Sequence, residues 1–143
     1  MVSVYLAGGI SGLSYDEATA WRNEAFNTLT SSGFSVLDPM RDKDCLSKEE
    51  FLSFDYRDRD EKLSPFAIFS RDIEDLNEAD IIFARLDTAK SVGAPWEVGY
   101  SYAKRKKIIL VVAEELESHP FVVGTTPHVY TDWKQALNTL INN

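Results

Sequence analysis

The sequence predicts an α/β fold in three layers, with a mostly parallel sheet of about five strands flanked by helices. Short apolar runs of strand length alternate along the chain with segments of helical periodicity. One run, residues 108–112, is almost wholly apolar, as in a central parallel strand. The length of 143 residues suits one core, so we expect a single domain over 1–143.

The first strand, at residues 2–7, leads into a glycine-rich turn at 8–12, where glycine lets the backbone take left-handed angles and a ligand come close. The spacing is not GxGxxG, so the turn is either a phosphate or sugar cradle or a plain strand-to-helix turn. A capping box at Ser14 starts a helix to about Ser31. Residues 34–37 form the second strand. Helical spacing predicts core positions at Ala18, Trp21, Ala25 and Leu29.

Residues 38–62 carry 6 basic and 9 acidic side chains with little periodicity. A connection this long in a compact domain usually has a role or is mobile. It could cover a pocket at the strand ends, or it could be a solvated excursion with a short helix near Lys48–Phe54. The sequence leaves both interpretations open.

A helix is predicted from Ser64-Pro65, because serine caps well and proline suits the first helical position. Asp72 shares or borders the apolar face of this helix, where a carboxylate is costly unless it is paired or used. Asp72 could equally reach solvent or a neighbouring arginine such as Arg71. The apolar face itself consists of Phe66, Phe69, Ile73 and Leu76.

Residues 79–107 are the stretch around which the chain is organised. A buried strand at 81–86 is followed by a turn at 87–93 and by Pro95, expected as the first helical residue. Glu97 then falls in the first helical turn, where the helix dipole favours the ionised form. Ligands bind beyond the carboxyl ends of strands in open α/β sheets. Glu97 is therefore a candidate nucleophile or base; a structural first-turn glutamate is the alternative.

The rest of the chain completes the sheet. A basic run at 104–107 suits a helix C-terminus and precedes the strand at 108–112. Residues 114–127 read as a loop, 128–130 as a short last strand and 132–142 as a final helix. This order implies right-handed crossovers and a sheet of the Rossmann or flavodoxin-like type.

Composition excludes several function classes. The net charge of −8, from 15 basic and 23 acidic residues, argues against nucleic acid as the partner. The single cysteine, Cys45, forms no internal disulfide, and two histidines with one cysteine give no zinc spacing. No membrane-length apolar run and no signal peptide are visible. We therefore expect a cytoplasmic protein with no metal or organic cofactor.

Three motifs occur in order: Tyr5 before the glycine-rich turn, Asp72 in Asp-Ile-x-x-Leu-x-x-Ala-Asp, and Gly-x-x-x-Glu-x-Gly-Tyr around Glu97. Together they resemble the nucleoside 2-deoxyribosyltransferase family, which includes the related N-hydrolases of 2'-deoxynucleoside 5'-monophosphates. The resemblance covers the chain from Tyr5 to at least Val112 and is most specific from Asp72 to Tyr100.

The resemblance implies that Glu97 attacks C1' of the sugar with retention, that Tyr5 orients Glu97, and that Asp72 manages the proton of the leaving base. These residue types suit the chemistry, because a carboxylate stabilises or traps an oxocarbenium-like centre and a leaving base needs a proton. A second base as acceptor would make the enzyme a transferase, and water would make it a hydrolase.

The resemblance also implies substrate contacts in the two turns. Ser91 stands where the transferases often carry an aspartate and where the monophosphate hydrolases carry a serine at the 5'-phosphate, which favours nucleotides. Gly9 and Ser11, however, stand where those hydrolases have a serine and an arginine, so the 5' end stays open. The implied substrate-binding residues of the turns are Gly8, Gly9, Ser11, Asp87, Ser91 and Gly93.

The family is oligomeric, and a neighbouring subunit completes the site from the loop after the fourth strand. Ser118 and His119 occupy that loop here, and Asp38 and Arg41 lie where they could touch the base. The implied partners are a nucleoside or nucleotide, a free base and further copies of the chain. A non-catalytic nucleotide-sensing domain with the same fold is the alternative from a different class.

Overall fold

The sheet contains five parallel strands in the order β2-β1-β3-β4-β5. This computed structural model describes residues 1–88 and 90–143; Ala89, within the predicted turn 87–93, lies outside the described residues. The order is that of a doubly wound sheet, and it confirms the predicted α/β class. The strands are β1 (Ser3–Gly8), β2 (Ser35–Leu37), β3 (Ile81–Arg85), β4 (Lys107–Val111) and β5 (Val129–Tyr130).

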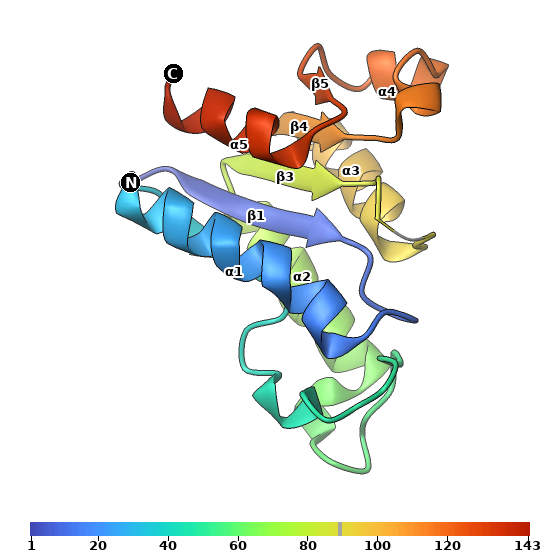
Figure 1. Cartoon of the computed structure of the whole chain (residues 1–143). Helices are drawn as coiled ribbons and strands as arrows, with labels where there is room; N and C mark the ends of the chain where they lie inside the picture. The colour runs from blue at the N-terminus through green and yellow to red at the C-terminus, as the bar shows by residue number, and fades with distance from the viewer. Residues whose placement is uncertain (89) are drawn as a thin grey trace.

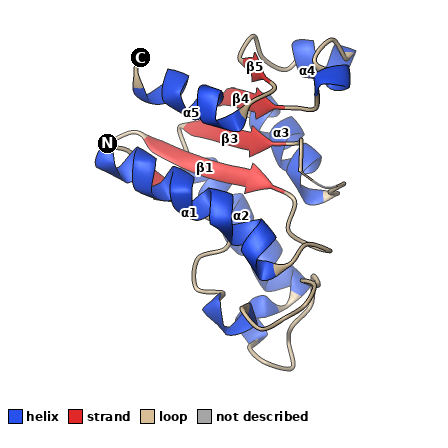
Figure 2. Ribbon diagram, in the orientation of Figure 1, coloured by secondary structure: helices blue, strands red, loops and turns tan. Residues whose placement is uncertain are grey.

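Helices cover both faces of the sheet. Figures 1 and 2 show α1 and α5 on one face and α2 and α3 on the other. Among the described residues, no helix is both long and apolar enough to cross a membrane. The helices are α1 (Tyr15–Ser31), α2 (Pro65–Glu78), α3 (Gly93–Ala103), α4 (Pro120–Val123) and α5 (Trp133–Ile141).

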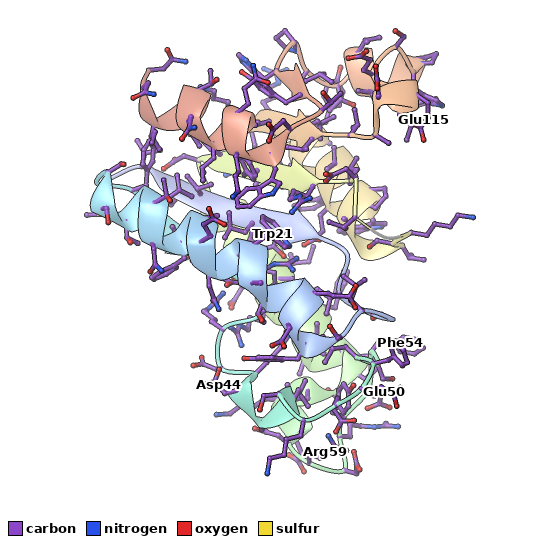
Figure 3. All side chains as sticks on the ribbon, viewed as in Figure 1. Trp21, Asp44, Glu50, Phe54, Arg59 and Glu115 are labelled. Carbon is purple, nitrogen blue, oxygen red and sulfur yellow. The ribbon has the colours of Figure 1, made fainter. Side chains whose placement is uncertain are left out.

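The alternation of side chains along β1 divides the core into two clusters. Val4 and Leu6 pack under α1 and α5, whereas Tyr5 lies in the cluster under α2 and α3. Trp21 belongs to the first cluster, edge-on to Trp133 with ring centroids 6.0 Å apart. Figure 3 places Trp21 on the side of α1 that faces the sheet. The predicted packing role of Trp21 is therefore confirmed.

The predicted helix starts are confirmed at two places. The Ser14 hydroxyl accepts from the Glu17 amide and the Glu17 carboxylate accepts from the Ser14 amide, both at 3.0 Å. The Ser64 hydroxyl accepts from the amide of Ala67 at 3.2 Å, with Pro65 first in α2. These bonds satisfy amides that have no partner within the helix.

The predicted apolar face of α2 is wrong in its first half. Ile73 and Leu76 pack in the core, but Phe66 is 80% exposed and Phe69 is 52% exposed. Figure 1 shows the reason, since the first turns of α2 run past the sheet and lie beside residues 38–62. Helical spacing identifies a common face, but the extent of the sheet decides how much of that face it covers.

Residues 38–62 form no helix near Lys48–Phe54, so that part of the prediction is wrong. Short 3-10 turns occur at Asp44–Leu46 and Glu61–Leu63 instead. Long-range bonds hold the segment, because the backbone of Leu52 pairs with Gly12 at 2.8 Å and with Leu13 at 2.7 Å. It also encloses a third small core, of Ala18, Met40, Leu46, Leu52, Tyr56 and Leu63.

The stretch at 114–127, predicted as a loop, contains a 3-10 turn at Glu114–Leu116 and the short helix α4. Pro120 occupies the first position of α4, and His119 caps it. A local signal for this helix was therefore present, because proline is favoured at the first helical position.

Candidate functional site

A cavity of about 720 Å³ opens at the carboxyl ends of β1 and β3, the point where the chain direction across the sheet reverses. Four parts of the chain line it: the turn after β1, residues 38–63, α2, and the start of α3. Residues 38–63 contribute side chains such as Met40, Leu46 and Leu52. The long segment therefore covers the cavity, as in one of the two interpretations that the sequence left open.

Tyr5 and Glu97 meet beneath this cavity, which Glu97 lines and Tyr5 does not. Tyr5 is fully buried in the middle of β1, and its hydroxyl donates a hydrogen bond to Oε2 of Glu97 in α3. Burial raises the pKa of Glu97 to about 7; the bond from Tyr5 opposes this rise and the charge of Asp72 adds to it. Burial, then Glu97, also raises the pKa of Tyr5, so that its hydroxyl keeps its proton and remains a donor.

The start of α3 differs from the prediction. The helix begins at Gly93, and the Ser91 hydroxyl accepts from the Ala94 amide at 3.1 Å. Pro95 is therefore the third helical residue and Glu97 the fifth, beyond the first turn. The expectation that the dipole keeps Glu97 ionised is wrong, because burial raises the pKa of its carboxyl instead.

Asp72 projects from α2 into the same cavity. Burial raises the pKa of its carboxyl to about 6; the charge of Lys43 lowers it and that of Asp75 raises it. Arg71 makes no ion pair with Asp72 and donates to the carbonyl oxygen of Arg41 at 2.9 Å. Two carboxyls that titrate near neutrality in one cavity can divide the roles of nucleophile and proton donor.

Lys43 is a cavity residue that the sequence did not reveal. The residue is only 6% exposed, although it lies in the most highly charged segment of the chain. Burial lowers the pKa of its ammonium, an effect that Asp72 partly offsets. A lysine among nine acidic residues reads as solvated, and no periodicity in the segment indicates otherwise.

Arg22 is a second charged residue that sequence reasoning missed. It is fully buried beneath the glycine-rich turn and donates to the carbonyl oxygens of Ala18 at 2.5 Å and Gly8 at 3.0 Å. Its charge lowers the pKa of Glu97. A signal was present, because Arg22 lies four residues after Ala18 on the face of α1 that helical spacing assigns to the core.

Position 8 must be glycine, because the side chains of Trp21 and Arg22 pack directly against its backbone. A Cβ atom there would lie 2.9 Å from Cζ2 of Trp21 and 3.3 Å from Nη2 of Arg22. The turn after β1 can therefore rest directly on Arg22 only because residue 8 lacks a side chain.

Eight further residues were implied to bind substrate. Gly8, Ser11, Ser91 and Gly93 line the cavity together with Asp72 and Glu97.

Gly9, Asp87, Ser118 and His119 are absent from the residues that line this cavity. Asp87 instead accepts two bonds from the Arg85 guanidinium, at 3.0 and 2.9 Å. His119 accepts from the amide of Phe121 through Nδ1 at 3.2 Å. These four residues do not join the other candidates within one chain.

Asp38 and Arg41 also lie outside the cavity lining. The Asp38 carboxylate accepts from the amide of Met40 at 2.8 Å and lies 3.7 Å from Nε of Arg22. The Arg41 guanidinium pairs with Asp75. Both residues therefore shape the segment that carries Met40 and Lys43. Over residues 1–88 and 90–143, no group of three or more acidic, histidine or cysteine side chains could hold a metal ion.

Comparison with known proteins identifies relatives along nearly the whole chain. The family model for nucleoside 2-deoxyribosyltransferase matches residues 4–139. No protein with a curated description matches the sequence. The solved structure of a 2-deoxyribosyltransferase from Bacillus psychrosaccharolyticus is 25% identical, with 96% of this chain and 91% of that chain covered and a TM-score of 0.65.

Two more distant structures share the fold. A 2-desoxyribosyltransferase from Leishmania mexicana is 14% identical, covers 100% of this chain and 99% of its own, and has a TM-score of 0.70. A CMP N-glycosidase from Clostridium botulinum is 20% identical, covers 99% of both chains and has a TM-score of 0.61.

Proposed function

The chain belongs to the nucleoside 2-deoxyribosyltransferase family, and from that premise we propose that it cleaves the N-glycosidic bond of 2'-deoxyribonucleosides with Glu97 as a covalent nucleophile. The family match makes it an enzyme of N-glycosyl transfer or hydrolysis. The contact between the Tyr5 hydroxyl and the Glu97 carboxyl carries the proposal, because it fixes one carboxylate oxygen and leaves the other for the sugar.

In the first step, an oxygen of the ionised Glu97 forms a bond to C1' while the bond from C1' to the base nitrogen breaks. The electron pair of that bond passes to the base, and Asp72 donates a proton to it. The cavity supports this division of roles, since Asp72 and Glu97 line the same space from different helices. The result is a deoxyribosyl ester on Glu97 and a free base.

In the second step, an acceptor attacks C1' and releases the Glu97 carboxylate. A second base as acceptor gives a new nucleoside, and water gives the free sugar; in both cases Asp72 takes up the proton that the acceptor loses. Two displacements at C1' retain its configuration.

A second candidate function is hydrolysis of 2'-deoxynucleoside 5'-monophosphates. Ser11 lines the cavity from the turn after β1, and Lys90 and Ser91 line it at the start of α3. Hydroxyl groups, a lysine and the amides of a helix start suit a phosphate. Lys90 is exposed, so a phosphate there would stay near solvent.

We further propose that the enzyme is a homo-oligomer in which Ser118 and His119 serve the site of a neighbouring subunit. The position of His119 supports this, because it caps α4 away from the cavity of its own chain.

A chromatographic time course tests these proposals. Each 2'-deoxynucleoside and each 5'-monophosphate is incubated with the protein, with and without a second base, beside a Glu97→Ala control. Base released from monophosphates alone, without an acceptor, supports the hydrolase. A new nucleoside that appears only with the second base supports the transferase. No turnover of any substrate would contradict both.

A further inference from the structure

Lys43 is a buried lysine whose ammonium has no partner in the described part of the chain. Only 6% of the residue is exposed, although Nζ is not among the side-chain atoms that are completely shielded from solvent. A largely desolvated ammonium is costly unless an acceptor reaches it. Since Lys43 lines the cavity, a ligand in that cavity can supply the acceptor.

The backbone before Lys43 is held in an unusual conformation. Asp42 has a φ of 62°, in the left-handed region that few residues other than glycine adopt. Two consecutive turns surround it, with the Arg41 amide donating to Asp38 at 3.0 Å and the Lys43 amide donating to Met40 at 3.3 Å. Such strain persists only where the surrounding structure imposes it.

Bonds from helix α2 hold the backbone around Asp42 in this conformation. The Arg41 guanidinium donates to both carboxylate oxygens of Asp75, at 2.6 and 2.9 Å, and Arg71 donates to the Arg41 carbonyl oxygen at 2.9 Å. These bonds tie the backbone two residues before Lys43 to the helix that carries Asp72. Lys43 and Asp72 are therefore held in a fixed relation by the same element.

The surroundings of Lys43 suit a heterocyclic base better than a phosphate. The groups suited to a phosphate, the Ser11 and Ser91 hydroxyls and Lys90, come from the two turns at the strand ends. Among charged groups, Asp72 does most to oppose the lowering of the Lys43 pKa by burial, so the lysine belongs to the Asp72 side of the cavity. Apart from Ser53, Tyr56 and Asp72, the other lining residues of the segment 40–63 and of α2 are apolar, among them Met40, Leu46, Leu52, Leu63, Ile68 and Ile73.

We propose that Lys43 is a further catalytic residue, whose ammonium donates a hydrogen bond to an exocyclic carbonyl oxygen of the leaving base. The inference rests on the proposed function. As the bond from C1' to nitrogen breaks, its electron pair enters the ring and part of the charge reaches the carbonyl oxygen. Lys43 stabilises that charge and keeps its proton, while Asp72 gives its own proton to a ring nitrogen.

The test compares two substrates that differ on one edge of the ring. Hypoxanthine carries a carbonyl oxygen at C6 and a hydrogen on N1, whereas adenine carries an amino group at C6 and no hydrogen on N1. We expect Lys43→Met to lower kcat/KM for 2'-deoxyinosine about 10- to 100-fold, the loss expected for a hydrogen bond to a charged group, and for 2'-deoxyadenosine by less than about 3-fold. Lys48→Met, an exposed lysine of the same segment outside the cavity, should match the wild type with both substrates.

Equal losses for the two substrates, or no loss, would overturn the inference. Lys43→Arg keeps the charge and should recover part of the preference, and thermal melting of each variant shows whether the fold is intact. Calorimetric binding of free hypoxanthine and adenine separates this inference from the proposed function. If the wild type turns over nothing but Lys43→Met loses hypoxanthine binding alone, the contact of Lys43 with the base carbonyl stands, whereas the catalytic role and the proposed function fall. If Lys43→Met changes neither kcat/KM nor calorimetric binding differently for hypoxanthine and adenine, the proposed role of Lys43 is wrong.

Discussion

The two walls of the cavity are built in different ways. The sheet wall, with Tyr5 and Glu97, comes from β1 and α3, whose side chains belong to the main core. The loop wall, residues 38–63, has a small core of its own. Figure 3 shows Arg59 of this segment at the far end of the molecule from the sheet. The proposed nucleophile Glu97 and proton donor Asp72 thus lie on helices, and much of the proposed base-binding surface, with Lys43, lies on an irregular segment, as is common in enzymes.

This difference predicts which kinetic parameter a substitution in each wall should change. A change in the sheet wall should alter kcat, because Glu97, the proposed nucleophile, lies there with Tyr5, which contacts it. A change in the loop wall should mainly alter KM or the choice of base, because we propose that this wall binds the leaving base; Lys43 is the exception, since its proposed role should also affect kcat. Helix α2 joins the two, since it carries Asp72 toward the cavity and Asp75 toward Arg41.

The largest effect is expected from Glu97→Gln. Loss of the nucleophile should lower kcat at least about 1,000-fold for every substrate, measured by base release. The variant should also melt higher than the wild type at pH 8. A buried carboxyl with a raised pKa loses its contribution to stability as the pH rises through about 7, and an amide does not ionise. Substantial turnover by the variant would show that Glu97 is not the nucleophile.

Asp72→Asn should have the second-largest effect, a fall in kcat of about 100- to 10,000-fold, as is typical when a proton donor is missing. The loss should shrink for a nucleoside whose base leaves readily without a proton. Rates for a series of leaving bases of different acidity measure this, with Glu74→Gln, an exposed carboxyl of α2 outside the cavity, as the control. An equal loss across the series would assign Asp72 a structural role.

Tyr5→Phe should lower kcat about 10-fold, as expected for one hydrogen bond to a charged group, and shift the pH profile. The wild-type profile of kcat/KM should be bell-shaped, with apparent pKa values of about 6 and 7 that belong to the coupled Asp72 and Glu97 pair. The reaction needs Glu97 ionised and Asp72 protonated, and because the pKa of Glu97 is the higher of the two, the alkaline limb follows Glu97. The bond from Tyr5 lowers the pKa of Glu97, so its removal raises that pKa and moves the alkaline limb to higher pH. An alkaline limb that stays in place would show that Tyr5 does not act on Glu97.

Arg41→Met should have the smallest effect and test the loop wall. It leaves the buried Asp75 carboxylate without its partner, while the Arg41 side chain is 36% exposed, so we expect a loss of about 1 kcal/mol in the free energy of unfolding. Because Arg41 ties the segment to α2, KM should rise several-fold with little change in kcat. Chemical denaturation and steady-state kinetics measure the two effects. A fall in kcat at constant KM would contradict the expectation that this part of the loop wall acts on substrate binding.

The sequence was sufficient where structure follows from local pattern. The strands, the Ser14 and Ser64 caps and the core position of Trp21 could be predicted, because periodicity and capping act within a few residues. The candidate trio of Tyr5, Asp72 and Glu97 required the family resemblance, since no local pattern relates residues 92 positions apart.

The loop wall could not be predicted, because contacts distant in sequence hold it. The bonds from Leu52 to Gly12 and Leu13 replace the helix expected near Lys48–Phe54. The sequence predicts a solvated Lys43. The residue is buried because the ion pair between Arg41 and Asp75, which are 34 positions apart, holds the segment against α2. Phe66 and Phe69 have the correct helical spacing, but the sheet does not extend far enough to bury them.

The central claim is that Glu97 forms a covalent bond to the sugar, and peptide mass mapping of rapidly quenched enzyme tests it most directly. The enzyme is mixed with a 2'-deoxynucleoside that it cleaves and stopped in acid within the first turnover. The account predicts a peptide that contains Glu97 and is heavier by one deoxyribosyl group, with no such peptide from Glu97→Gln. Base release in the first turnover without that adduct, or with the adduct on another residue, would contradict it.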